Sequence, residues 1–346
     1  MTEPVSPQPV LTPLTTAAVF LVLGVAAGGE DKVRTLLGEF SAIATDVAAL
    51  AVDSELACVV GFGSEAFDRL FEAELNGARP AHLHVLPEIV GARHTSVSTP
   101  GDLLLHVRAR SMGLCFEFVE RAMWQLDGVV TVIDEVHGFG YFDERNLMGF
   151  VDGTANPIGA EAVEAVLISS SEDPAFADGS YVVVQKYLHD LSAWQTLSVA
   201  EQERVIGRSK VDDIEMDDAV KPLNSHVAAT TLLDDDGAER QIVRRNMPFG
   251  RPGYGEYGTY FIGYAADPAV TEQMLVNMFL GRPEGNPDRI LDFSTAITGT
   301  LFFVPSRNFL DGLKAAAPGG VSPQRDYSLG IGGLKYLNDS TRKATP

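Results

Sequence analysis

The feature that most constrains the fold of this chain is an order of strand-like and helix-like segments that occurs twice. Period-2 or continuous apolar runs predict strands, and apolar residues at helical spacing predict helices. In the first half the predicted strands are 17–25, 56–61, 103–109 and 129–142, and the predicted helices are 32–52 and 112–123. In the second half the predicted strands are 181–187, 241–245, 258–264 and 299–304, and the predicted helices are 198–206 and 270–280. Both halves therefore read β-α-β-β-α-β.

This order predicts an α+β protein made of two ferredoxin-like halves with antiparallel sheets. A doubly wound parallel fold is the competing architecture, but no G-x-G-x-x-G pattern follows any predicted strand. The predicted organisation is an irregular, proline-rich arm at 1–16, an N-terminal ferredoxin-like domain at 17–165, a C-terminal one at 166–317, and a flexible tail at 318–346.

Charge and cysteine content narrow the class of protein. The formal net charge is −21 over 346 residues, which disfavours nucleic acid and anionic membranes as partners because phosphate contacts need clustered cations. The two cysteines, Cys58 and Cys115, stand alone in apolar runs, as is typical of buried thiols in a reducing compartment. The longest apolar run, 17–27, is too short to span a bilayer and has no basic residue before it. A cytoplasmic location is therefore expected.

Four polar features stand out from the apolar background. They are the glycine-flanked segment 149–157 around Asp152, the lone His226 in Asn-Ser-His-Val, the run Arg-Arg-Asn-Met-Pro-Phe at 244–249, and the pair Asp288 and Asp292. Taken singly, each suits an ordinary structural role as a turn, a core histidine, a strand end or a helix cap.

In combination these features resemble the dye-decolorizing peroxidases, in particular the short bacterial type. The motif G-x-x-D-G at 149–153, a histidine about 70 residues later, and R-x-N at 244–246 occur in the family's order. The resemblance extends over residues 9–315. It implies the same duplicated ferredoxin-like fold, with one haem b bound in the C-terminal half.

The resemblance also assigns the residues that hold the cofactor. His226 matches the proximal ligand of the haem iron, and its second ring nitrogen is expected to face a carboxylate, as ligating histidines usually do. Asp288 is the predicted partner, with Asp292 in reserve. Arg208 matches a position that pairs with a haem propionate. Gly153 and Thr154 are also predicted to contact the cofactor.

Asp152, Arg244 and Asn246 match the distal residues, which act on hydrogen peroxide. A carboxylate can shuttle a proton between the two peroxide oxygens if it is ionised, so acid–base catalysis is assigned to Asp152. Arg244 cannot exchange a proton at ordinary pH, and its expected role is to stabilise developing negative charge. Asn246 is expected to orient peroxide or water. The division of work between Asp152 and Arg244 differs among family members and stays open here.

The expected activity is peroxide reduction coupled to the oxidation of dyes, phenolic compounds or other one-electron donors, by a homo-oligomer. The acidic Glu215 and Glu239 are candidate contacts for cationic donors. Two alternatives of the same fold are a haem carrier and an enzyme that removes iron from haem. The first has no need of a distal proton shuttle.

The tail contains a second resemblance. Leu329, Ile331 and Leu334 alternate with glycines in Ser328–Lys335, a pattern suited to an extended segment that places apolar side chains in a groove of a partner. The segment resembles the peptides that load cargo enzymes into encapsulin nanocompartments. The alternative is a terminus that packs on its own domain or on a neighbouring subunit, and Tyr336–Pro346 extend beyond the matching segment.

Overall fold

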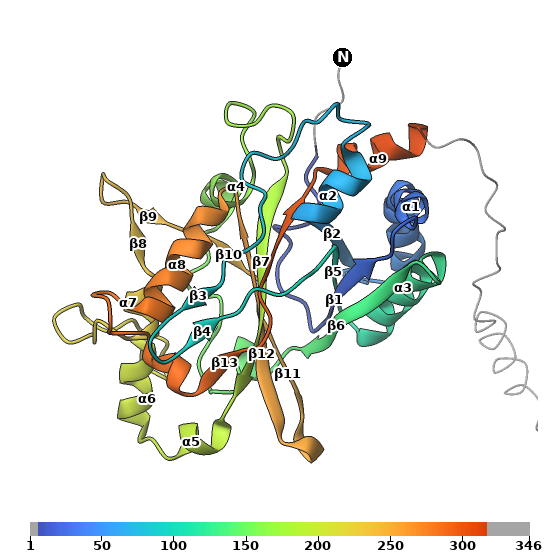
Figure 1. The fold of residues 1–346 in the computed structure, drawn as a ribbon. Helices are drawn as coiled ribbons and strands as arrows, with labels where there is room; N and C mark the ends of the chain where they lie inside the picture. Colours follow the sequence, from blue (N-terminus) through green and yellow to red (C-terminus); the bar gives the residue numbers. More distant parts are fainter. Residues whose placement is uncertain (1–5, 317–346) are drawn as a thin grey trace, which may run out of the picture. The chain divides into compact units, whose positions relative to one another are not determined.

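The computed structural model describes residues 6–316 (Figure 1). In the N-terminal half its elements are β1 (Ala17–Val25), α1 (Glu30–Ala48), β2 (Ala57–Gly63), α2 (Ser64–Phe71), β3 (Ile89–Val90), β4 (Thr95–Ser96), β5 (Leu103–Ala109), α3 (Met112–Gln125) and β6 (Val130–Phe139). The predicted strands and helices of this half are all present. α2 and the short hairpin β3–β4 were not predicted.

The C-terminal half has the same plan with more short elements. Its helices are α4 (Gly159–Val166), α5 (Leu191–Gln195), α6 (Val199–Ile206), α7 (His226–Thr230), α8 (Pro268–Leu280) and α9 (Arg307–Ala316). Its strands are β7 (Ser180–His189), β8 (Leu232–Leu233), β9 (Glu239–Arg240), β10 (Val243–Arg244), β11 (Met247–Arg251), β12 (Glu256–Ala265), β13 (Ser294–Ala296) and β14 (Thr300–Val304).

Three predicted elements were too long. The helix expected to reach residue 52 ends at Ala48, because Leu50 and Val52 are exposed and have no core to join. The strand expected to reach residue 142 ends at Phe139, since Phe142 lies on the surface in a short 3-10 turn. The strand expected over 241–245 is only Val243–Arg244.

One antiparallel sheet joins the two halves. Its strand order is β10-β12-β7-β14-β2-β5-β1-β6, with β11 also pairing β12 and β13 pairing β7. Within each half the four main strands follow the same order, second-third-first-fourth, which is the ferredoxin-like arrangement. The halves meet where β14 pairs β2 through Phe302↔Gly63 and Phe303↔Phe62. The predicted duplicated ferredoxin-like fold is confirmed.

Both faces of this sheet are covered, which explains why β1 is apolar along its whole length. Val19, Leu21 and Leu23 face the core formed with α1 and α3. The alternate residues, such as Phe20 and Val22, belong to a second core on the opposite face, which includes Val10 of the N-terminal arm. In Figure 1, α8 lies beside β7 of the C-terminal half, and this is where the cavity described below is found.

The N-terminal arm is bound to the sheet by polar side chains. No helix or strand forms in its described residues, 6–16. Gln8 donates from Nε2 to the carbonyl of Val60 (3.0 Å) and accepts the amide N–H of Val60 at Oε1 (2.9 Å). The fully buried Arg108 donates to the carbonyls of Pro9 (2.6 Å) and Thr12 (2.7 Å), and Arg245 also donates to the carbonyl of Thr12 (2.8 Å). These bonds hold the arm over the second core.

Cys58 and Cys115 are free and buried, as expected. Within residues 6–316 the structure contains no helix that combines the length and the apolar character needed to cross a membrane. The predicted tail at 318–346, with its segment Ser328–Lys335, lies outside the described residues.

Candidate active site

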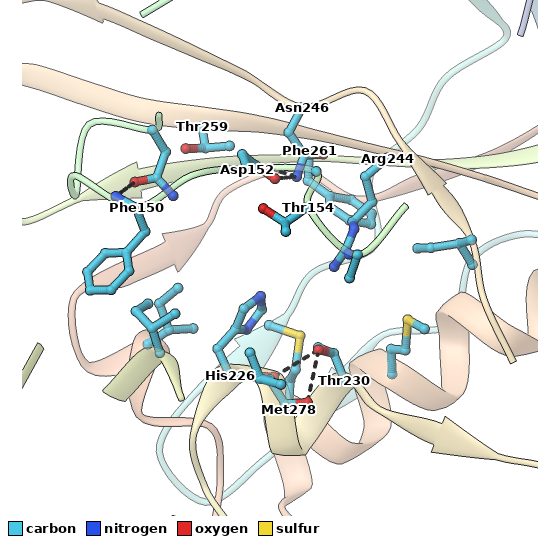
Figure 2. A pocket seen from close by; sticks show the side chains of 18 of the residues that line it. Phe150, Asp152, Thr154, His226, Thr230, Arg244, Asn246, Thr259, Phe261 and Met278 are labelled. Atoms are coloured by element: carbon cyan, nitrogen blue, oxygen red, sulfur yellow. Dashed lines mark hydrogen bonds between the residues drawn. The ribbon is translucent and has the colours of Figure 1, made fainter. Parts of the chain in front are cut away.

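A cavity of about 280 Å³ lies in the C-terminal half, lined by residues between Asn146 and Ser294. Figure 2 shows its two sides. On one side His226 and Thr230 of α7 lie with Met278 of α8. On the other side are Asp152 and Thr154 of the glycine-rich loop, with Arg244 and Asn246 from β10 and the segment that follows it. The predicted cofactor and distal residues thus face each other across one cavity.

His226 is the first residue of α7, a position set by the helix cap. Ser225 precedes it, is buried, and accepts the amide N–H of Ala228 at its hydroxyl, so the helix begins at a fixed place. The imidazole Nδ1 lies 2.7 Å from Oδ2 of Asp288. A carboxylate at that distance accepts a hydrogen bond from Nδ1–H, and this tautomer leaves the lone pair on Nε2 for the cavity.

Asp288 is itself held in place. It is 1% exposed, and its second oxygen accepts the amide N–H of Ile290 at 2.9 Å, at the start of the 3-10 turn Arg289–Asp292. Asp292, the reserve candidate, does not contact His226. It pairs instead with Arg93, and its carboxylate lies 3.4 Å from His94 and 3.8 Å from Arg289. The structure therefore brings His226 to Asp288, which is 62 positions away in the chain.

Asn246 orients Asp152 on the opposite side. The amide N–H of Ile262 in β12 donates to Oδ1 of Asn246 at 3.0 Å. This contact fixes the orientation of the amide, so that Nδ2 points to the Asp152 carboxylate, 3.2 and 3.3 Å from its two oxygens. Because the side chain of Asn246 takes a ladder hydrogen bond of β12, the strand predicted over 241–245 is interrupted after Arg244.

Arg244 directs its side chain into the cavity (Figure 2). Its Nε is buried and has no hydrogen-bond partner among the described residues. A buried N–H without a partner is costly, so this group is suited to a ligand that brings an acceptor. The main-chain N–H and carbonyl of Arg244, in contrast, both form hydrogen bonds with the side chain of Asn156.

Arg208 and Thr154 lie at another part of the lining and meet through Asp213. Arg208 donates to the carbonyl of Asp213 (2.6 Å), and Thr154 donates to the Asp213 carboxylate (2.5 Å). Arg208 also lies 3.5 Å from the carboxylate of Glu215. Gly153, Thr154, Arg208 and Glu215 all line the cavity.

β7 contributes three residues to the cavity that were not predicted as site residues. Gln185, Tyr187 and His189 alternate along this strand and line the cavity. Burial lowers the pKa of His189 to about 4, and its two ring nitrogens lie 2.8 Å from the Ser294 hydroxyl and 2.9 Å from that of Thr259. This histidine is uncharged at neutral pH. The alternation of residues along 181–189 was the signal that could have identified the three.

The residues present fit the haem that the sequence resemblance implies. Only one imidazole nitrogen in the lining is left without a partner by the described contacts, Nε2 of His226. Apolar side chains suited to a flat macrocycle line the same cavity, among them Phe150, Ile206, Val227, Phe261 and Met278. The lining also supplies the cations Arg208 and Arg240 for anionic propionates, and the unpartnered Nε–H of Arg244.

Comparison with known families supports the same conclusion. Residues 7–140 match the sequence model of the family described as Dyp-type peroxidase, N-terminal, and residues 143–309 match that of Dyp-type peroxidase, C-terminal. The chain is 56% identical to the dye-decolorizing peroxidase of Mycolicibacterium paratuberculosis over 335 residues, which are 96% of this chain and 93% of that protein.

Solved structures show the same similarity in three dimensions. The encapsulated DyP-type peroxidase from Mycobacterium smegmatis is 56% identical, with a TM-score of 0.86 over 89% of this chain and 98% of that chain. DyPB from Rhodococcus jostii is 52% identical, with a TM-score of 0.85 over 88% of this chain and 97% of that chain. A variant of the Rhodococcus jostii protein, 52% identical to this chain, has been solved in complex with haem.

Proposed function

This chain belongs to the dye-decolorizing peroxidase family, a family of haem b oxidoreductases, and from that premise we propose that it reduces hydrogen peroxide with His226 as the iron ligand and with Asp152, Arg244 and Asn246 acting on peroxide. One observation carries the proposal: the His226–Asp288 pair faces the Asp152–Asn246 pair and the Arg244 guanidinium across a single cavity.

Haem, when bound, supplies the redox-active iron through which peroxide is reduced. His226 offers Nε2 as ligand, and Asp288 holds the Nδ1 proton in a buried hydrogen bond of 2.7 Å. That bond fixes the ring and increases the electron density on the ligating nitrogen. Arg208 and the neighbouring Gly153 and Thr154 complete the proposed binding residues.

The distal residues divide the handling of charge and proton. Asp152 accepts a proton from one oxygen of hydrogen peroxide and returns it to the other, so that water leaves as the O–O bond breaks. Asn246 donates from Nδ2 to this carboxylate and keeps it directed at the cavity. Arg244 keeps its proton throughout, and its charge stabilises the negative charge that develops on oxygen.

The experiment that tests the function follows the absorption spectrum of the haem-loaded protein after one equivalent of hydrogen peroxide, with and without a dye. We expect a rapid shift of the Soret band, followed by its return as the dye is oxidised. A Soret band that ignores peroxide would contradict the peroxidase assignment and would favour the haem carrier considered above.

We further propose that the protein is a cytoplasmic homo-oligomer enclosed in an encapsulin shell, with Ser328–Lys335 as the docking segment. The proposal is supported by the spacing of Leu329, Ile331 and Leu334 and by the similarity to the encapsulated peroxidase of Mycobacterium smegmatis. Apolar side chains at alternate positions suit an extended peptide bound in a groove.

Two truncations test this docking segment. Removing residues 318–346 is expected to abolish co-purification of the peroxidase with assembled encapsulin shells, because the apolar anchors are lost. Removing only Tyr336–Pro346 leaves these anchors and is the matched control, with loading expected to persist. Equal loading of both truncated proteins would show that the docking residues lie elsewhere.

A further inference from the structure

Arg244 lies on a strand whose outer edge is open. β10 is one of the two terminal strands of the sheet, and among the described residues it pairs with β12 alone. In an antiparallel pair, alternate residues direct both main-chain groups toward the partner strand. Arg245 donates its amide N–H to Ile262 of β12 at 3.0 Å, so the preceding residue, Arg244, directs its own N–H and carbonyl away from the sheet.

The side chain of Asn156 occupies that open edge. The amide N–H of Arg244 donates to Oδ1 of Asn156 at 2.8 Å, and Nδ2 of Asn156 donates to the carbonyl of Arg244 at 2.9 Å. The carboxamide thus makes the two bonds that the next strand of a sheet would make. A second donor, Nη1 of Arg245, also reaches this carbonyl at 3.1 Å, but Asn156 alone meets the N–H among the described contacts.

Asn156 closes a tight turn that begins directly after Asp152. Its amide N–H donates to the carbonyl of Gly153 at 2.9 Å. Gly153 has a φ of +86°, and a Cβ at this position would lie 3.2 Å from Nδ2 of Asn156. A side chain at residue 153 would therefore be strained and would crowd the carboxamide. The short segment 152–156 therefore carries both the carboxylate of Asp152 and the carboxamide that bonds the main chain of Arg244.

We propose that Asn156 is a positioning residue of the peroxidase site: it fixes the main chain of Arg244 relative to Asp152, so that the guanidinium meets the oxygen on which charge develops. The inference rests on the role proposed above for Arg244. Electrostatic stabilisation depends on where the charged group lies, and a misplacement of about 1 Å can cost about a hundredfold in rate.

The chain contains a matched control for this pair of hydrogen bonds between a side-chain amide and a strand residue. Gln8 brackets the N–H and the carbonyl of Val60 in β2 with the same pair of hydrogen bonds, at 2.9 and 3.0 Å. Gln8 is buried, and neither residue lines the cavity. Gln8→Ala therefore removes an equivalent pair of side-chain amide hydrogen bonds from a strand that carries no proposed catalytic residue.

The experiment compares Asn156→Ala, Asn156→Asp and Gln8→Ala in the haem-loaded protein. Three quantities are measured: the rate of reaction with hydrogen peroxide, the affinity for fluoride as an anionic probe of Arg244, and hydrogen exchange at the Arg244 amide. We expect Asn156→Ala to lower the rate and the fluoride affinity by about tenfold to a hundredfold and to accelerate exchange at Arg244. Asn156→Asp keeps an acceptor for the N–H, so its exchange stays slow and its losses are smaller.

Gln8→Ala is expected to lower the melting temperature while leaving the fluoride affinity and the rate unchanged. In an Arg244→Leu background, Asn156→Ala should cause no additional loss, because residues that act through one group are not additive. A full additional loss in that background, or an unchanged fluoride affinity in Asn156→Ala, would overturn the inference. If Arg244→Leu itself has no effect on rate or fluoride affinity, the proposed role of Arg244 fails instead, and the two failures are distinguished.

Discussion

Replacing His226 with alanine is expected to remove haem from the protein. Nε2 of His226 is the one imidazole nitrogen of the described cavity lining that no hydrogen bond engages. Loss of an outer partner of a metal ligand typically costs tenfold to a hundredfold in affinity, so loss of the ligand should cost more than about a hundredfold. The measurement is the Soret absorbance that remains after reconstitution with haem and gel filtration.

Two further variants sharpen this result. Asp288→Asn keeps a side chain of the same shape but removes the charge that faces Nδ1, and we expect a loss of haem affinity of about tenfold to a hundredfold. Asp292→Asn is the control, because Asp292 pairs with Arg93, His94 and Arg289 rather than with His226. Undiminished haem binding by His226→Ala would identify another ligand, and His189 is the other histidine of the described lining.

Arg244→Leu is expected to retain haem but to react with hydrogen peroxide about a hundredfold to a thousandfold more slowly. That range is typical for removing one preorganised group that stabilises developing negative charge. Nε of Arg244 forms no hydrogen bond with any described residue, so this part of the guanidinium is free to bind a ligand. Stopped-flow absorbance after mixing with peroxide gives the rate directly.

Arg251→Leu provides the control for the loss of an arginine from the same edge of the sheet. Arg251 lies at the end of β11, pairs with Glu256 and does not line the cavity, so its rate should match the wild type. A normal rate in Arg244→Leu would assign the distal chemistry to Asp152 and Asn246. In that case Asp152→Ala should show the whole decrease in the rate of reaction with hydrogen peroxide.

The fold could be predicted from the sequence where burial dictates the pattern. The strand at 17–25 is enclosed on both faces, so its run of apolar residues matches the observed bounds of β1. α2 was missed although Ala66, Phe67, Leu70 and Phe71 form a buried stripe at helical spacing. The missed helix is only eight residues long, and short segments are where such patterns are weakest. The boundary proposed between the halves, after residue 165, stays a prediction.

The site was less accessible to sequence reasoning because its contacts join distant residues. Asp288 was preferred to Asp292, four residues later, as the partner of His226, but the contact itself is visible only in the fold. Asn156 looked like part of a turn. Its role depends on Arg244 lying at an open sheet edge, and no local pattern around residue 156 contains that information.

The position of β14 has a consequence for how the protein is made. Among the described residues this strand is the last to be synthesised, yet it lies in the middle of the sheet, with five residue pairs to β7 and two to β2. Until it emerges from the ribosome, β7 and β2 each present an open edge, and open edges are templates for pairing with the wrong chain. A messenger cut short before codon 300 would therefore yield two unjoined half-sheets rather than a slightly smaller enzyme.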